Sequence, residues 1–214
     1  MKKYFLLLFL SILAFSGCKR NSLIIPVSGI DLEISIIRFE QELFEMNLDN
    51  VPESAKELYS RYPHFFSLFS YIINIGNPDD PAFEEFLVAF LTNRMNNEIY
   101  LKSQEVFSNI DFLERKLTRA FQHYKYYFPE KNVPEIYTFI SGFNSSIIID
   151  TNILGIGIDR YLGTDYEYYP RLGLPMYIRN NMYPEKIPSG CKANYPLSGV
   201  KSKPAPLGSD FYLA

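Results

Sequence analysis

The carboxylates that follow the predicted strands are the first candidates for chemistry in this sequence. Asp150 and Asp159 end two neighbouring strands, and Asp165 and Glu167 lie in the loop beyond them. Two carboxylates that converge near a pocket could act as a general acid and a general base. Aspartates at strand ends also face water routinely. The pattern therefore favours solvated strand ends over a catalytic pair.

Other chemistry lacks the residues that it would need. The chain has two histidines, His64 and His123, and neither has a partner histidine three or four residues away, so the sequence predicts no metal site. Gly155 and Gly157 lie inside a strand pattern with no following helix, which indicates close backbone approach rather than phosphate binding. Cys191 has no nearby base and is a poor nucleophile candidate. We predict no catalytic residue and no cofactor.

Tyrosine and arginine crowd the segment that follows the last predicted strand. Both residue types are enriched at the energetic centres of protein interfaces. The same side chains could equally pack a loop onto a small sheet, so both interpretations stay open. The candidate interaction surface consists of Arg160, Tyr161, Asp165, Tyr166, Tyr168, Tyr169 and Arg179.

The N-terminus has the three-part layout of a secretory signal peptide. A cationic start precedes an apolar run over 4–15 and the small pair Ser16-Gly17. The apolar run gives only about 18 Å of helix, against about 30 Å for a bilayer core. Cys18 follows directly, and residues 14–18 resemble a lipobox. We predict that residues 1–17 are a signal peptide and that Cys18 is lipidated, with acyl chains such as palmitate anchoring it to a membrane.

Composition bounds the remaining chain. The net charge of −3 becomes more negative once the signal peptide is removed, so nucleic acid is not an expected partner. The 47% of apolar residues allows a full core. With Cys18 committed to lipid, Cys191 has no partner for an intrachain disulfide. Cys18 is followed by Lys19 and Arg20, so no acidic retention signal is present after the cysteine. We therefore expect the protein to be anchored in the outer membrane and to face the periplasm.

The elements that would position these residues give an α+β chain, mostly helical in its first two-thirds. Alternation predicts a strand over 30–36, and helical spacing predicts helices over 38–47, 51–62, 65–75, from 79 onward, and from 109 or 111 to 127. Strands over 136–140, 146–150 and 154–159 predict a small antiparallel three-stranded meander. The predicted organisation is a signal peptide over 1–17, a lipidated tether over 18–29, a domain over 30–188 and an irregular tail over 189–214.

Four stretches together carry a family resemblance, namely residues 34–44, 62–66, 154–163 and 177–182. They resemble the gliding-motility-associated lipoprotein GldB of the Bacteroidota, from about residue 18 to Pro188. The family offers no established catalytic residues to carry over, and it is distantly similar to zincin-type metallopeptidases. Its members continue past the equivalent of Pro188 with helical sequence. The resemblance therefore implies an altered, frameshifted or truncated end from Ser189.

The expected function follows from the anchor and the resemblance. We expect a non-enzymatic envelope lipoprotein that contacts the membrane through its lipid and acts through other envelope proteins in a gliding-motility-associated system. One alternative is a degenerate or truncated zinc metallopeptidase-like protein. Another is a lipoprotein that binds a glycan or peptide on its tyrosine-rich loop.

Overall fold

A mixed four-stranded sheet forms the centre of the molecule. The computed structural model describes residues 26–194, with side chains described as far as Cys191. The strand order is β1-β2-β4-β3, in which β1, β2 and β4 run parallel and β3 runs antiparallel to β4. The strands are β1 (Ile36–Arg38), β2 (Glu135–Phe139), β3 (Ile147–Asp150) and β4 (Ile153–Gly157).

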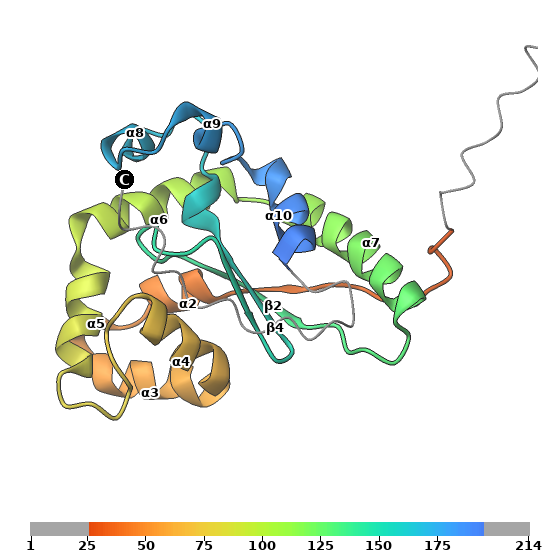
Figure 1. Ribbon diagram of the computed structural model, residues 1–214. Helices are drawn as coiled ribbons and strands as arrows, with labels where there is room; N and C mark the ends of the chain where they lie inside the picture. The colour runs from red at the N-terminus through yellow and green to blue at the C-terminus, as the bar shows by residue number, and fades with distance from the viewer. Residues whose placement is uncertain (1–25, 195–214) are drawn as a thin grey trace, which may run out of the picture.

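Helices cover both faces of this sheet (Figure 1). The longer ones are α3 (Val51–Arg61), α4 (Pro63–Ile72), α5 (Phe83–Thr92), α6 (Arg94–Val106), α7 (Asp111–Tyr127) and α10 (Ile187–Asn194). The shorter ones are α2 (Phe39–Phe44), α8 (Tyr168–Arg171) and α9 (Met176–Arg179), with the 3-10 turns η1 (Leu48–Asn50), η2 (Ile158–Tyr161) and η3 (Pro184–Lys186).

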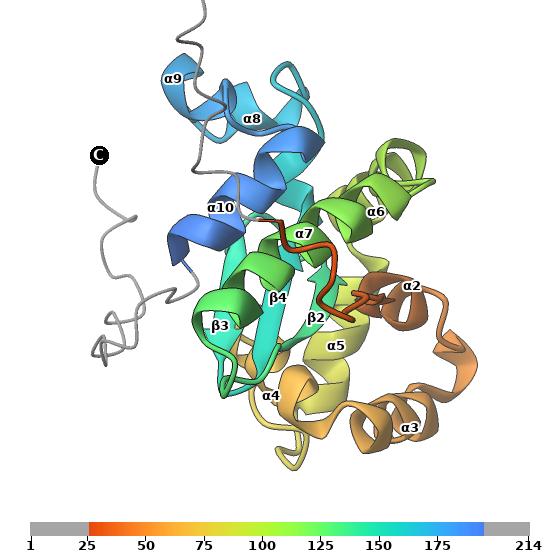
Figure 2. The same cartoon turned by 90° about the vertical axis from the view of Figure 1, so that its right-hand side faces the viewer.

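The core has two parts, one on each face of the sheet. Helices α3, α4 and α5 pack on one face, and α7 and α10 pack on the other (Figure 2). Alternate residues of β2 divide between them, since Ile136 joins the α7 side while Tyr137 and Phe139 join the α4 side. Because both faces are covered, β4 is buried at every position. The observed class is α+β, as predicted.

Glycine is required in β4 because two neighbours lie directly against its backbone. A Cβ atom added to Gly155 would lie 2.9 Å from the ring of Phe65. One added to Gly157 would lie 2.1 Å from the carbonyl oxygen of Ser145. The interpretation of these glycines as sites of close approach is confirmed.

The predicted antiparallel meander is wrong, although its three strands lie where expected. β4 inserts between β2 and β3 and is parallel to β2. The chain therefore leaves β2 through residues 140–146, here called the crossover loop, which passes over the end of β4 at Gly157. Consecutive strands usually neighbour each other, which is why sequence order suggested a meander. The expected zincin resemblance is likewise not confirmed.

The predicted strand over 30–36 is also wrong, because regular pairing starts only at Ile36. Before it the chain runs along α7. The N–H of Ile34 donates to Thr118 Oγ1 at 3.0 Å, and the N–H of Ile36 donates to Glu114 Oε1 at 2.9 Å. Side chains of a helix thus take the place of a strand partner.

Helix α6 was not predicted. Its start signal is Asn93, whose side chain accepts the N–H groups of Met95 and Asn96. The helices predicted over 38–47, 51–62, 65–75, from 79 and to 127 correspond to α2, α3, α4, α5 and α7.

The irregular tail does not start at Ser189, because α10 continues through Asn194. Cys191 is consequently buried on a helix rather than placed in an unstructured segment. Within residues 26–194 no helix is both long and apolar enough to cross a membrane. The predicted signal peptide, Cys18 and the segment from residue 195 lie outside the described residues.

Candidate interaction surface

A buried carboxylate holds the base of the candidate surface. Asp159, in η2, is fully buried, and its Oδ2 accepts the backbone N–H groups of Ser141 at 3.0 Å and Phe143 at 2.7 Å. The hydroxyl of Ser141 donates to the same oxygen at 3.2 Å. These bonds fasten the crossover loop to the end of β4. Asp159 therefore holds the crossover loop in place. This loop allows β4 to lie between β2 and β3, which is the difference between the observed sheet and the predicted meander.

The other oxygen of this carboxyl group, Asp159 Oδ1, is buried with no hydrogen-bond partner among the described residues. Burial raises the pKa of Asp159 from 3.8 to about 6, against the bonds from Phe143 and Ser141, which act in the opposite direction. The nearest cation, Arg160, donates instead to the carbonyl oxygen of Phe143 at 3.2 Å. Asp159 thus acts as a fastening for the crossover loop.

The carboxylates considered for acid–base chemistry do not converge. Asp150 pairs in register with Ile153, at the start of β4, whereas Asp159 follows the end of that strand. Asp150 Oδ2 lies 3.2 Å from His64 Nε2 at the exposed start of α4. Asp165 and Glu167 are exposed. The geometry provides no paired carboxylates at the candidate surface.

A second buried carboxylate lies at the junction of β1 and α2. Glu40 Oε1 accepts Arg38 Nε at 2.5 Å, and its Oε2 accepts the hydroxyl of Thr138 at 2.7 Å. Arg38 also donates to the carbonyl oxygen of Phe107 at 3.0 Å and to Gln104 at 3.3 Å. This network joins β1, α2, α6 and β2, and sequence reasoning missed it.

Tyr169 attaches the tyrosine-rich segment to the domain. Its ring is fully buried, and its hydroxyl donates to the carbonyl oxygen of Asp159 and accepts the N–H of Leu162, both at 2.9 Å. The ring also contacts Phe143 and Tyr166 edge-on, at 5.8 and 5.4 Å between centroids. Burial raises the pKa of Tyr169, so it stays a neutral donor. Tyr169 is therefore a packing residue.

Tyr168 makes the second attachment, to α6. Its hydroxyl donates to Glu98, and this bond lowers the pKa of Glu98 and raises that of Tyr168. Glu98 also accepts Arg94 Nε at 2.7 Å. The loop closes where the N–H of Gly163 donates to the carbonyl oxygen of Met182 at 2.9 Å. Residues 163–182 thus form a loop, here called the excursion. Its two ends are joined by a hydrogen bond, and Tyr168 and Tyr169 attach it to the domain.

Three apolar side chains stay exposed on this excursion, and we call them the apolar tip. They are Leu172 before the turn at Gly173, and Met176 and Tyr177 at the start of α9. Tyr177 is 72% exposed, the largest value among the exposed large apolar residues that the structure describes. Arg171 stands beside them and pairs with Glu167 at 2.6 Å. A small apolar patch beside a charged pair resembles the centre and rim of a protein interface.

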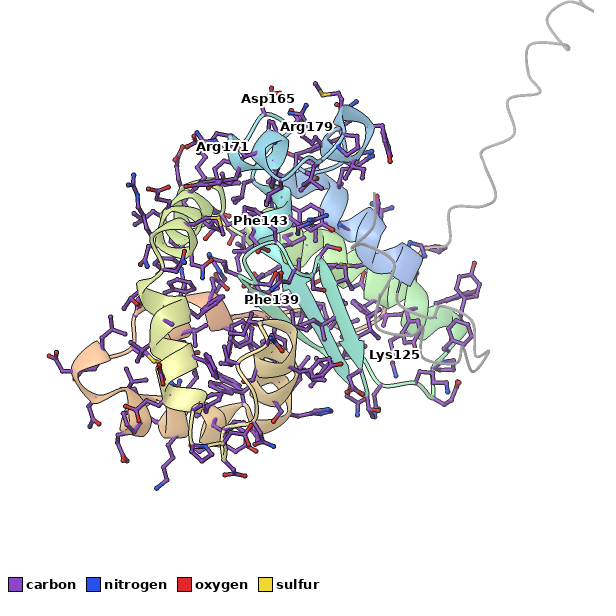
Figure 3. All side chains as sticks on the ribbon, turned by 60° about the vertical axis from the view of Figure 1, so that its left-hand side comes forward. Lys125, Phe139, Phe143, Asp165, Arg171 and Arg179 are labelled. Atoms are coloured by element: carbon purple, nitrogen blue, oxygen red, sulfur yellow. The ribbon has the colours of Figure 1, made fainter. Side chains whose placement is uncertain are left out.

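The seven predicted surface residues divide into two groups. Tyr161 and Tyr169 are buried, so they pack the loop onto the sheet. Asp165 is exposed, and the remaining four are partly exposed: Arg160, Tyr166, Tyr168 and Arg179. Figure 3 shows Asp165, Arg171 and Arg179 at one end of the molecule, with Phe143 between them and the sheet. The predicted segment contains the exposed apolar residues Leu172, Met176 and Tyr177, but none of these three was among the seven predicted surface residues.

The described residues offer no assembled catalytic centre. Across residues 26–191 no group of three His, Cys, Asp or Glu side chains could hold a metal ion. Burial raises the pKa of the Cys191 thiol to about 12, so the thiolate required for nucleophilic attack is rare at neutral pH. Cys191 is a core residue.

The model of the family described as gliding motility protein GldB matches residues 20–205. The chain belongs to the GldB family. Comparisons with curated proteins and with solved structures gave no match. Membership makes this chain a lipoprotein of the gliding-motility system, associated with the cell envelope. The GldB match extends past Ser189 and includes all of α10, while the altered end stays a prediction for the residues beyond 194.

Proposed function

We propose that this GldB-family chain is a non-enzymatic lipoprotein, anchored through Cys18 in the outer membrane, that binds another envelope protein through its apolar tip. The observation that carries the proposal is the exposure of Leu172, Met176 and Tyr177 on a loop that is fastened internally. A loop whose backbone is already held in place loses little conformational entropy when it binds, which favours recognition.

Different side chains of this loop attach it to the domain and face solvent. Tyr169 and Tyr168 turn inward and bond to Asp159 and Glu98. Met176 and Tyr177, later in the same loop, face solvent. An envelope protein with a small apolar pocket is the expected partner.

The test is site-specific photo-crosslinking in the cells that make the protein. A photoreactive residue at Tyr177 should form one defined adduct, and Met176→Asp should abolish that adduct. Cells that carry Met176→Asp should also lose gliding or the corresponding envelope phenotype. The matched control is Leu101→Asp on α6, where Leu101 is 67% exposed. It should leave the adduct and the phenotype intact at equal protein levels.

Retention of both the adduct and the phenotype in Met176→Asp would refute the apolar tip as the contact surface. Stoichiometric zinc in the purified full chain would refute the non-enzymatic proposal, because it would indicate a metal centre.

A further inference from the structure

The N-terminal segment enters the described domain along α7, in a regular order. Ile36 bonds to Glu114, Ile34 bonds to Thr118, and the carbonyl oxygen of Ile30 accepts Gln122 Nε2 at 3.1 Å. From Ile36 back to Ile30, each successive bonding partner thus lies one helical turn closer to the C-terminal end of α7. Figures 1 and 2 show the first described residues beside this half of the helix. The tether therefore leaves the domain near the end of α7.

The length of the tether limits how far this end can lie from the membrane. Seven residues lie between Cys18 and Pro26, the first described residue, so eight residue steps separate the two. Fully extended, they reach about 27 Å. α7 alone, with 17 residues, is about 25 Å long. A lipid on Cys18 therefore keeps the C-terminal end of α7 close to the bilayer, while the apolar tip lies at the other end of the molecule (Figure 1).

That end of α7 exposes a pair of aromatic side chains. Tyr126 and Tyr127 are 53% and 60% exposed and contact each other edge-on at 5.3 Å. Lys125 holds the turn that follows, since its Nζ donates to the carbonyl oxygens of Pro129 at 2.6 Å and Lys131 at 2.7 Å. The two rings consequently stand on a fixed helix end. Tyrosine prefers the membrane interface, where its ring is buried and its hydroxyl stays hydrated.

The charge of α7 also favours contact with a membrane surface. From Arg115 to Tyr127 α7 carries basic side chains and no acidic one. Among the described residues, Arg115, Lys116 and Arg119 form no salt bridge. Asp31 and Glu33 line a crevice of about 1050 Å³ opposite Arg115 and Arg119 and reduce the local charge. The tyrosines are therefore the main contact, and anionic lipid adds a smaller attraction.

We infer that the C-terminal end of α7 rests on the membrane that holds the lipid anchor, with Tyr126 and Tyr127 inserted at the interface. The inference rests on the anchor at Cys18 that the proposed function includes. This placement directs the opposite end of the domain, with Leu172, Met176 and Tyr177, away from the bilayer.

The test uses the full lipidated chain in vesicles of phosphatidylcholine and phosphatidylglycerol in equal parts. The chain has no tryptophan, so Tyr127→Trp provides a single fluorescent reporter. Tyr177→Trp is the matched control at the apolar tip. The vesicles should shift the emission of the Tyr127→Trp variant to the blue, and lipids brominated on their acyl chains should quench it. The emission of the Tyr177→Trp variant should stay unchanged. Equal quenching in both variants, or none in vesicle-bound Tyr127→Trp protein, would overturn the inference.

Two further arms separate this inference from the function itself. Flotation with the vesicles tests the anchor first, and a chain that does not float overturns the anchor and this placement together, while the contact at Met176 is tested independently. In the Tyr127→Trp background, Lys116→Gln with Arg119→Gln should lower the ratio of docked to undocked protein by less than about fivefold per charge, because Asp31 and Glu33 reduce the local charge. The same double variant should have no effect in vesicles of phosphatidylcholine alone, and an equal loss there would contradict the electrostatic contribution.

Discussion

The two fully buried carboxylates among the described residues, Glu40 and Asp159, are stabilised in different ways. Glu40 has a cation, Arg38, at 2.5 Å and a hydroxyl, from Thr138, on its second oxygen. Asp159 has only neutral donors on one oxygen and none on the other among the described residues. Both side chains are 0% exposed, so burial alone does not distinguish them.

The difference shows what each carboxylate can be used for. A buried charge with a partner of opposite charge depends on that partner for its stabilisation. A buried carboxylate with only neutral donors has a raised pKa, because burial disfavours its charged form. Glu40 therefore joins β1, α2 and β2 through its bonds to Arg38 and Thr138. Asp159 fastens the crossover loop, and its contribution to stability changes with pH.

The largest expected effect comes from removing the cation of the first site. Arg38→Met leaves the charge of Glu40 buried without compensation, and Arg38 is itself only 14% exposed. We expect the free energy of unfolding to fall by about 3–5 kcal/mol, measured by urea denaturation at pH 7.

The control is the same substitution in the surface pair of Arg61 with Glu42, where both side chains are partly exposed. Arg61→Met should cost less than about 1 kcal/mol. The double variant Arg38→Met, Glu40→Met should recover part of the loss, because no charge stays buried. A double variant as unstable as Arg38→Met alone would show that packing, and not charge, dominates this site.

Sequence reasoning found the elements better than their pairing, for a physical reason. Apolar spacing on α7 and the strand character of β2, β3 and β4 are local properties, and these elements lie where predicted. The order β2-β4-β3 depends on the crossover loop, which is fixed by contacts from Asp159 and by the missing side chain of Gly157. Such contacts join residues distant in sequence, and no periodicity reports them.

The second expected effect is a dependence on pH that belongs to Asp159. Its pKa rises from 3.8 to about 6 in the folded state. Between these values the folded protein binds a proton that the unfolded chain has lost, so stability from this group falls as pH rises and is least above pH 6. A shift of about 2 units corresponds to about 3 kcal/mol.

Asp159→Asn keeps an acceptor for Ser141 and Phe143 and cannot ionise. The difference in unfolding free energy, variant minus wild type, should increase by up to about 3 kcal/mol between pH 4 and pH 7.5. Asp165→Asn, at an exposed position, should show no such trend. A constant difference at all pH values for Asp159→Asn would mean that this carboxyl titrates normally.

The candidate surface was also only partly predictable. Its location followed from the density of Tyr and Arg over 160–183, because that is a property of composition. Which side chains face inward depends on single bonds, such as those in which the Tyr169 hydroxyl donates to the carbonyl oxygen of Asp159 and accepts the N–H of Leu162. Leu172, Met176 and Tyr177 were not selected because no local sequence pattern shows which apolar residues of a loop face solvent.

The smallest expected effect tests the second oxygen of Glu40. Thr138→Val keeps the shape of a fully buried side chain and removes the hydroxyl that donates to Glu40 Oε2 at 2.7 Å. Loss of a hydrogen bond to a buried charge should lower the unfolding free energy by about 2 kcal/mol, less than loss of the Arg38 cation. Thr92→Val, where an exposed hydroxyl donates to the carbonyl oxygen of Val88, should change it by less than about 0.5 kcal/mol in the same urea titration. Equal effects at Thr138 and Thr92 would mean that Arg38 alone stabilises Glu40. The contrast with Asp159 would then reduce to the presence of one cation.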